Sequence, residues 1–395
     1  MTEIDPLLEG LNPQQSEAVT HAGGPLLVVA GAGSGKTRVL TRRIAYLMSR
    51  RNVAPYQILA ITFTNKAAGE MKERVADLVG PIAKSMWVST FHSACVRILR
   101  QEATRLGYSN SFSIYDSADS QRLITIVSKE LNLDPKRYPA RQFQSMISNA
   151  KNELLGPQDY LNAASSQFEQ VVADVYAVYQ QRLIRANAMD FDDLILKTVE
   201  VLQRYPEAKA RFRSRFRHVL VDEYQDTNHA QYILVKELVG SELEGQAPAE
   251  LCVVGDADQS IYGFRGATIR NILQFELDYP NARTVLLEQN YRSTQNILNA
   301  ANAVITKNES RKEKNLWSDA GAGSPLTGYV AESEHDEANF IADEIRSLQR
   351  EGISTPGDTA IFYRTNAQSR VFEEVFMRNA LPYKVVGGLR FYERR

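Results

Sequence analysis

The sequence has little cysteine and no long apolar run. Its 395 residues include two cysteines, Cys95 and Cys252, and no CxxC pair, so neither a disulfide framework nor a zinc ribbon is expected. The longest apolar stretch starts at Pro25 and is far shorter than the roughly 20 residues that a membrane-spanning helix needs. The acidic start MTEIDPLLEG has no basic n-region, so we expect no signal peptide. These absences predict a cytoplasmic protein with reduced thiols.

Neither sign of charge is in excess. The 46 Lys and Arg residues stand against 47 Asp and Glu residues, which gives a net charge of −1. This balance argues against a protein coated in positive charge, although it leaves room for a local basic groove. Apolar residues make up 44% and charged residues 24% of the chain, as in globular proteins. At about 150 residues per domain, the length suggests two to three domains.

Short β-branched runs alternate with longer amphipathic stretches over much of the chain. The predicted strands are residues 26–30, 58–63, 86–90, 218–222, 251–256 and 283–288. Helical sequence follows each of them. Continuous apolar strands separated by helices predict an α/β fold, in which a parallel sheet is covered on both faces.

Two regions depart from this alternation. Residues 107–216 carry helical spacing and polar connectors, so we expect an all-helical insertion there. Strand-like runs return at 326–331, 358–363 and 382–386, separated by helical sequence. These runs predict part of a second α/β domain.

A glycine-rich segment, AGAGSGKT at 30–37, lies between a predicted strand and a predicted helix. Backbone N–H groups of such a loop bind phosphate, Lys36 would neutralise phosphate oxygens, and the Thr37 hydroxyl would ligate Mg²⁺. Ala30 stands where the strict pattern has glycine. The candidate nucleotide-binding residues here are Ala32, Gly33, Ser34, Gly35, Lys36 and Thr37. The alternative is a simple glycine-rich turn.

Two adjacent carboxylates follow the apolar strand HVLVD. Asp222 would reach Mg²⁺, and Glu223 would take a proton from the attacking water, which are the two roles that phosphoryl transfer needs. Taken alone, the pair also fits two solvated carboxylates at a strand end. The phosphate loop in the same α/β chain favours the catalytic interpretation.

Together, AGAGSGKT and VDEYQD resemble the superfamily 1 DNA helicases of the UvrD/PcrA/Rep type. Further segments match that family's motifs in the same order: LNPQQSEAV (11–19), TFTNKAAGEM (62–71), STFHS (89–93), DFDDL (190–194), VVGDADQSIYGFRGA (253–267), LEQNYRS (287–293) and FYRTNAQSR (362–370). The resemblance spans nearly the whole chain, and its motifs are specific.

The resemblance implies a P-loop (RecA-like) motor domain with a helical insertion, followed by part of a second RecA-like domain. The first motor domain would comprise residues 1–106 and 217–287, with the insertion at 107–216. Residues 288–395 would form the first part of the second motor domain. Since the family's proteins run on for several hundred residues, a fragment is expected, weak or inactive in unwinding.

The resemblance also implies ATP and Mg²⁺ as cofactors. Gln15 would pair with the adenine edge, and Arg38 with Tyr291 would sandwich the adenine ring. Arg292 would reach the γ-phosphate as an arginine finger, and Gln259 would sense hydrolysis. Surface roles are the alternatives for Gln15 and Arg292, and a plain loop amide is the alternative for Gln259.

Asp256, three residues before Gln259, has two open roles. It would either support the metal shell or hold its loop through a cap.

For nucleic acid, the resemblance points to aromatic residues at strand ends. Bases would stack on Phe63, Tyr262 and Phe264, the last standing where the family commonly has tryptophan. Polar neighbours suited to DNA contact are Thr64, Lys66, Thr90, His92, Arg265 and Asn366. A core aromatic is the alternative for Phe63, and a structural histidine for His92. The basic run 204–218 would either follow a duplex or form a solvated helix face.

Three functions compete at this point. The leading one is a DNA-dependent ATPase motor acting on single-stranded DNA and its junctions with duplex, with the 3′→5′ polarity of the family and DNA-repair proteins as further partners. A small-molecule kinase would use the same phosphate loop but leaves QSIYGFRGA and STFHS unexplained. A non-motor ATP- or DNA-binding module that docks partners is the third. The sequence leaves the oligomeric state open.

Overall fold

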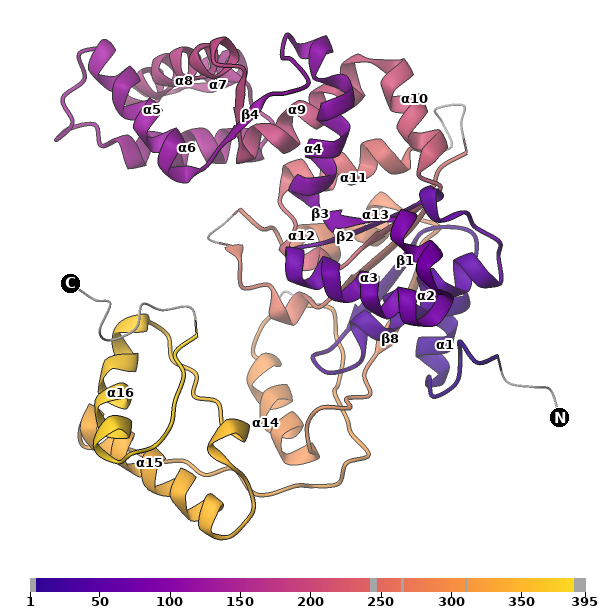
Figure 1. The fold of residues 1–395 in the computed structure, drawn as a ribbon, viewed down its shortest axis with the longest axis vertical. Helices are drawn as coiled ribbons and strands as arrows, with labels where there is room; N and C mark the ends of the chain where they lie inside the picture. Colours follow the sequence, from indigo (N-terminus) through magenta and orange to yellow (C-terminus); the bar gives the residue numbers. More distant parts are fainter. Residues whose placement is uncertain (1–4, 242–246, 264–265, 310, 387–395) are drawn as a thin grey trace. The chain divides into compact units, whose positions relative to one another are not determined.

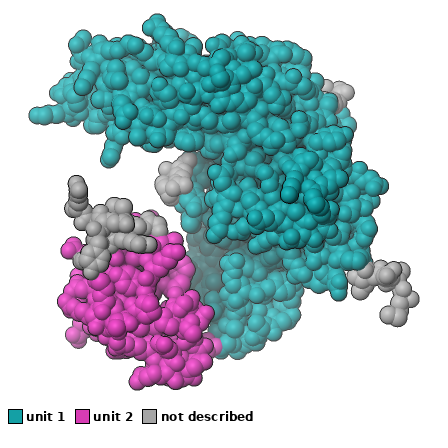
Figure 2. Space-filling view, in the orientation of Figure 1, with its two compact units in different colours: residues 1–323 teal, residues 324–395 magenta. Residues whose placement is uncertain are grey.

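The computed structural model describes residues 5–241, 247–263, 266–309 and 311–386 (Figure 1). The chain divides into two compact units, Met1–Gly323 and Ser324–Arg395 (Figure 2). Among the described residues, no helix is both long and apolar enough to cross a membrane.

A parallel sheet forms the centre of the first unit. Among the described residues it has six strands in the order β3-β2-β6-β7-β1-β8, and each neighbouring pair is parallel. The strands are β1 (Leu26–Ala30), β2 (Ile58–Thr62), β3 (Trp87–Thr90), β6 (His218–Val221), β7 (Glu250–Gly255) and β8 (Arg283–Leu287). All six lie where the apolar runs predicted them. Strands buried on both faces need apolar side chains at successive positions, which is why the signal was clear.

Helices cover both faces of this sheet (Figure 1). Leu26 and Val28 share one core with α1 (Pro13–Thr20), α2 (Lys36–Ser49) and α3 (Asn65–Val79). Leu27 and Val29 point to the other core. That second core is built with α4 (Phe91–Glu102), α9 (Phe191–Arg204), α10 (Pro206–Arg215), α11 (His229–Val239), α12 (Arg270–Leu273) and α13 (Phe275–Asp278). The alternation follows from the two-residue period of a strand.

The insertion has a hydrophobic core of its own, and Figure 1 shows its helices gathered beyond α4 and α9. It contains α5 (Ser117–Glu130), α6 (Ala140–Asn152), α7 (Pro157–Ala163) and α8 (Gln167–Arg185). The expectation of an all-helical insertion needs correction, because β4 (Ser113–Tyr115) and β5 (Ala188–Asp190) form a parallel pair. Strands of three residues are too short to show a period in sequence. The buried side chains of α9 and α10 join the sheet core instead.

After β8 the first unit continues through α14 (Gln295–Ile305). The second unit then contains α15 (Glu334–Arg350) and α16 (Ser369–Arg378), which pack around Ala338, Ala342 and Phe376.

The strands predicted in the second unit are absent from its described residues, 324–386. Apolar side chains that a buried strand would cover are exposed: Val330 is 96% and Phe362 is 93% exposed. A β-strand is stable only beside hydrogen-bonded partners and against a core. These runs pair with no strand in this part of the chain, so their local preference does not produce a sheet.

Candidate functional site

Four segments of the first unit meet at the carboxyl edge of the sheet. They are the phosphate loop after β1, the acidic turn after β6, the loop after β7 and the segment after β8 (31–35, 222–226, 256–263 and 288–292). These strands are neighbours in the order β6-β7-β1-β8, and all are parallel. Their ends therefore place the four segments side by side, at the edge where open α/β sheets bind ligands.

The carbonyl groups of the phosphate loop are all bonded to protein donors. Ser34 Oγ donates to Gly31 O at 2.8 Å, Asn290 Nδ2 to Ala32 O at 2.6 Å, Tyr291 N to Gly33 O at 2.9 Å, and Gln15 Nε2 to Ser34 O at 2.8 Å. In contrast, the N–H groups of Ala32, Gly33 and Gly35 have no hydrogen-bond partner within the described part of the chain. The loop thus presents donors only, as an anion site requires.

Two glycines make this loop conformation accessible. Gly33 has φ +69° and Gly35 has φ +88°, both in the left-handed region that favours glycine. A Cβ on Gly33 would lie 2.7 Å from Asn290 Nδ2, and one on Gly35 would lie 2.9 Å from Gln15 Nε2. Gly35 also begins α2 without a side-chain cap, which leaves the first-turn N–H groups of the helix available to a phosphate.

The phosphate loop and the acidic turn are joined by an ion pair. Lys36 Nζ lies 2.8 Å from Glu223 Oε2, with the Lys36 side chain only 12% exposed. Glu223 has φ +48°, and its N–H donates to Asp222 Oδ1 at 3.0 Å. The structure therefore brings together the cation and the two carboxylates, although Lys36 and Glu223 are 187 residues apart in the sequence.

The acidic turn has three carboxylates, Asp222, Glu223 and Asp226, and Lys36 of the phosphate loop is paired with one of them. Burial, reinforced by the charge of Glu223, raises the pKa of Asp222 to about 6. The same causes raise the pKa of Asp226 to about 6, and its buried Oδ1 has no hydrogen-bond partner in the described residues. This excess charge suits a cation. Among the described residues, no group of three or more His, Cys, Asp or Glu is arranged to hold a metal ion.

The residues predicted to hold the adenine base gather at the start of α1. Gln15 is fully buried, and its Oε1 accepts the N–H of Asn12 at 3.2 Å. Asn12 Nδ2 donates to the Tyr291 hydroxyl at 3.0 Å. Tyr291 is 52% exposed, and Arg38 is exposed on the first turn of α2. Asn12 therefore links two of the three predicted groups, and sequence reasoning had not singled it out.

Arg292 is positioned by Asn290, a buried residue that sequence reasoning quoted only as part of a motif. Asn290 Oδ1 accepts the N–H of Arg292 at 2.8 Å, while its Nδ2 holds the carbonyl of Ala32. The Cβ of Arg292 lies 2.8 Å from a Cβ placed on Gly33. The segment after β8 therefore packs directly on the phosphate loop. The Arg292 side chain begins at this point of contact.

Gln259 lies at the end of a short 3₁₀ turn, η6 (Ala257–Gln259). Its Nε2 donates to Asp256 Oδ2, and Asp256 Oδ1 accepts the N–H of Asp258 at 3.0 Å. Asp256 thus caps its own loop, one of the two roles that the sequence left open.

Gln225 connects that loop to Glu223, and sequence reasoning missed it. The buried Gln225 donates to Glu223 Oε2 at 2.9 Å and accepts the N–H of Asp256 at 2.9 Å. A glutamine between two carboxylates in VDEYQD was the available signal.

Several predicted DNA-contacting residues lie at the ends of β2 and β3. These two strands are neighbours in the sheet, and their last residues, Thr62 and Thr90, lie opposite each other. Phe63 is half-buried and meets the buried Phe91 edge-on, with ring centroids 5.8 Å apart. Thr64 and Thr90 cap α3 and α4 through their hydroxyls. Both threonines therefore have structural roles at the edge where the prediction placed them.

The remaining DNA-contact predictions lie in different surroundings. Lys66 has an 88% exposed side chain, and Tyr262 is 37% exposed in the loop after β7. Burial lowers the pKa of His92, which meets the exposed ring of Phe191 edge-on at 5.8 Å. Phe191 was not singled out from the sequence.

Three further predicted contacts cannot be joined to this group. Asn366 is exposed at the start of a 3₁₀ turn, Asn366–Gln368, in the second unit. Phe264 and Arg265 lie outside the described residues.

Two family descriptions cover nearly the whole chain. Residues 11–280 match the UvrD/REP helicase N-terminal domain, and residues 285–395 match the UvrD-like helicase C-terminal domain. The chain belongs to the UvrD/REP helicase family. Its parallel sheet and phosphate loop are consistent with the P-loop (RecA-like) fold expected for that family.

Named relatives in the UvrD/REP family are similar over the full chain. It is 63% identical over 396 residues to ATP-dependent DNA helicase UvrD1 of Mycobacterium tuberculosis, covering 99% of this chain and 51% of the relative. It is 54% identical over 389 residues to ATP-dependent DNA helicase PcrA of Bacillus subtilis, covering 98% of this chain and 52% of the relative. The chain therefore spans about half the length of these UvrD/REP relatives.

Two carboxylates of the family motif DFDDL, Asp190 and Asp193, are buried in the structure. Asp190 Oδ2 and Asp193 Oδ1 lie 2.7 Å and 2.9 Å from the Nζ of the fully buried Lys151. Although burial opposes its charge, the two carboxylates hold the pKa of Lys151 well above its usual value. This part of the motif therefore stabilises the insertion.

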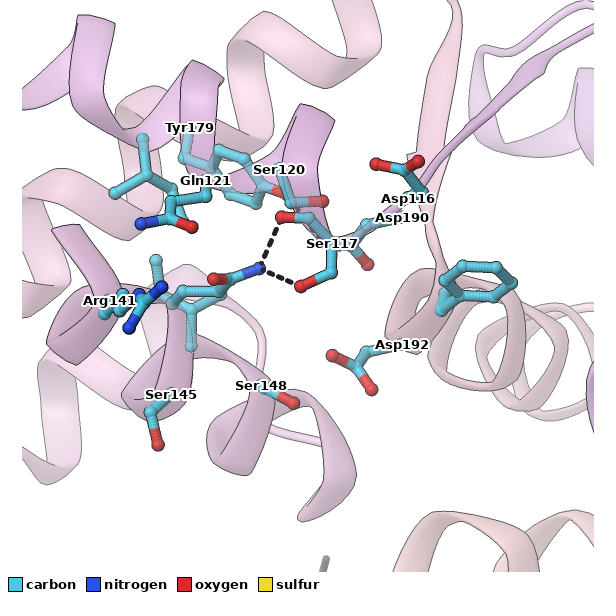
Figure 3. Close-up of a pocket in the computed structure, with 14 residues that line it drawn as sticks. Asp116, Ser117, Ser120, Gln121, Arg141, Ser145, Ser148, Tyr179, Asp190 and Asp192 are labelled. Atoms are coloured by element: carbon cyan, nitrogen blue, oxygen red, sulfur yellow. Dashed lines mark hydrogen bonds between the residues drawn. The ribbon is translucent and has the colours of Figure 1, made fainter. Parts of the chain in front are cut away.

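Beside this ion cluster is a pocket of about 560 Å³, most of whose lining residues are polar (Figure 3). Two of its lining residues are hydrogen-bonded, since Gln144 Nε2 donates to the carbonyl and the hydroxyl of Ser117. Burial, and then the charge of Asp190, raises the pKa of Asp192 to about 6.

Most of the basic run 204–218 lies in α10, and three of its cations bind partners within the unit. Lys209 Nζ lies 2.7 Å from Glu237 Oε2, Arg213 Nε donates to the carbonyl of Glu237 at 2.7 Å, and Arg211 pairs with Glu102. These contacts support a packing role for the run over a duplex-binding one.

Proposed function

We propose that this chain binds ATP with Mg²⁺ at the carboxyl edge of its sheet and hydrolyses it in response to single-stranded DNA, as a motor of 3′→5′ polarity. The observation that carries the proposal is the donor-only phosphate loop, with Lys36 paired to Glu223. The names of the relatives, ATP-dependent DNA helicases, support the same activity. Single-strand/duplex junctions, DNA-repair proteins and a cytoplasmic location belong to this proposal.

The ion pair suggests how ATP would activate its own hydrolysis. The phosphate loop would bind the β-phosphate through its N–H groups, and Lys36 would exchange Glu223 for β- and γ-phosphate oxygens. Glu223, released from its cation, would then accept a proton from the attacking water. Gln225 would keep the Glu223 carboxylate in place through the 2.9 Å hydrogen bond that it donates.

The remaining groups would complete the site. Thr37 and Asp222 would hold Mg²⁺, whose charge offsets that of the phosphate oxygens during transfer. Arg292 would donate to the γ-phosphate, and Gln259 would contact both that phosphate and the attacking water. Gln15, Arg38 and Tyr291 would hold the adenine base.

DNA would lie across the ends of β2, β3 and β7, where Phe63 and Tyr262 offer ring faces and Lys66 a phosphate contact. Polar contacts would come from Thr64, Thr90 and His92. Phe264, Arg265 and Asn366 remain predicted contacts from sequence. Base stacking reads no base edges, so binding would show little sequence preference.

The test is ATP hydrolysis with and without single-stranded DNA. We expect DNA to stimulate the wild-type rate, and Lys36→Ala to remove ATP binding and hydrolysis together. Lys84→Ala is the matched control, since Lys84 is exposed before β3, at the opposite edge of the sheet. ATP turnover that ignores DNA would support a kinase instead, and binding without turnover would support a docking module.

A further inference from the structure

The segment 311–317, near the end of the first unit, contacts three elements of the nucleotide site. Asn290 N donates to Trp317 O at 2.8 Å, which pairs the segment with the stretch that carries Arg292. The Leu316 side chain lies directly against Gly31, where an added Cβ would collide with it. The third contact is with the loop after β7, which two buried cations of the segment bind.

These cations, Lys314 and Arg311, bind both carboxylates of that loop. Lys314 Nζ lies 2.6 Å from Asp256 Oδ1 and also pairs with Asp258. Arg311 Nη2 lies 2.9 Å from Asp258 Oδ2. The Lys314 side chain is 2% exposed and that of Arg311 is 9% exposed. Water therefore screens these pairs poorly. Losing Lys314 leaves the buried Asp256 carboxylate without its cation, whereas losing Arg311 leaves Asp258 with one cation in place of two.

The clamped loop is short and has a different task at each end. Asp256 binds the Gln259 side chain and is linked through Gln225 to Glu223, so its start belongs to the nucleotide site. Tyr262, three residues after Gln259, belongs to the proposed DNA surface. A shift of this loop would move both ends, and a displacement of about 1 Å at a catalytic group can cost about 100-fold in rate.

We infer that Lys314 and Arg311 are positioning residues that hold this loop in register, so that DNA bound at Tyr262 stimulates ATP hydrolysis through Gln259. The inference rests on the proposed DNA-dependent ATPase. It extends the site to two residues that touch neither ATP nor DNA in the proposed arrangement.

The test compares Lys314→Gln with Lys312→Gln. Lys312 lies in the same segment and is also ion-paired, but with Glu276 of α13 at 2.5 Å. We expect Lys314→Gln to lower the DNA-stimulated kcat by roughly 10- to 100-fold while KM for ATP changes little. The substitution disturbs the loop after β7 and leaves the phosphate loop as it is. Lys312→Gln should keep the stimulation, and Lys314→Arg, which retains the charge, should recover part of it.

A second readout needs no hydrolysis. Amide hydrogen exchange over residues 256–262 should become faster in Lys314→Gln and stay unchanged in Lys312→Gln. A wild-type protein without DNA-stimulated hydrolysis would overturn the proposed function. The exchange data would still show whether Lys314 and Arg311 hold the loop after β7 in place. Normal DNA stimulation in folded Lys314→Gln overturns the inference. If that variant does not fold, Arg311→Gln decides in the same way: reduced stimulation supports the inference and normal stimulation overturns it.

Discussion

Glu223 has a backbone conformation that residues other than glycine rarely adopt, with φ +48° and ψ +44°. Such a conformation costs about 1–3 kcal/mol and persists only where neighbouring contacts enforce it. Here the enforcing contacts are the Lys36 ion pair, the hydrogen bond from Gln225, and the hydrogen bond that the Glu223 N–H donates to the Asp222 carboxylate. The carboxylate is thus fixed at the strand tip before any substrate binds.

Glu223→Gln separates the proposed binding and proton-transfer roles. The amide cannot accept a proton from water, so we expect the DNA-stimulated rate of ATP hydrolysis to fall by about 10²- to 10⁴-fold. ATP binding should persist, because Lys36 and the loop N–H groups remain. Fluorescent ATP titration and steady-state hydrolysis measure the two effects. Loss of binding equal to that of Lys36→Ala would contradict the assigned roles.

The raised pKa of Asp192, which lines the pocket of the insertion, predicts that stability depends on pH. Its pKa is raised from 3.8 to about 6, and an acid with a raised pKa binds its proton more tightly in the folded than in the unfolded chain. The contribution of Asp192 to the free energy of unfolding should therefore fall as pH rises from about 4 to about 6.

Asp192→Asn removes this ionisation, so the variant should gain stability relative to wild type across the same pH range. Urea unfolding at several pH values measures the difference. The matched control is Asp174→Asn, an exposed position on α8. If the stability difference between wild type and Asp192→Asn stays constant with pH, the Asp192 charge is not penalised in the folded protein.

Among the elements, α6, β5 and α9 are joined by one buried ion cluster. Lys151 on α6 binds Asp190 of β5 and Asp193 of α9, and the Tyr179 hydroxyl of α8 donates to Asp190 at 2.8 Å. Asp190 also caps α9, since its Oδ1 accepts the N–H of Asp193. The cluster therefore fixes where the insertion ends and the sheet-covering helix begins.

Lys151→Met should destabilise the protein by about 3–5 kcal/mol, because it leaves two buried carboxylates without their cation. The control is Lys197→Met, whose partner Glu200 is one helical turn away on α9 and more exposed. That variant should lose at most about 1 kcal/mol. Denaturant unfolding followed by circular dichroism compares them, and similar losses in both would contradict the special role of the buried cluster.

For the whole molecule, a net charge of −1 gives no general attraction to nucleic acid, so DNA affinity must come from local contacts. Two of the proposed contacts differ in kind. Lys66 would neutralise phosphate, whereas Tyr262 would stack on bases.

Salt titration of single-stranded DNA binding distinguishes these contacts. Lys66→Ala should reduce the slope of log affinity against log salt by about 0.7, which corresponds to one phosphate contact. Tyr262→Ala should weaken binding by about 1–3 kcal/mol at every salt concentration and for every base sequence. Lys84→Ala serves as the control for lost charge. A sequence-dependent loss in Tyr262→Ala would indicate base-edge recognition and contradict stacking.

The sequence by itself determined the sheet strands, the phosphate loop and the acidic turn. Each of these depends on neighbouring residues: a strand buried on both faces needs an unbroken apolar run, and a loop with φ near +69° and +88° needs glycine at those positions. Such requirements are visible in a few consecutive letters. The nucleotide-binding and catalytic roles of individual residues remain predictions.

Only the tertiary structure decided which distant residues meet. Asn12, Gln225, Asn290 and Lys314 are ordinary polar residues in sequence, and their importance comes from single hydrogen bonds or ion pairs across the fold. The strand-like runs of the second unit show the converse, since a local strand preference forms no strand without partners. Apolar periodicity is a property of a segment, whereas hydrogen-bond and charge pairing are properties of the space between segments.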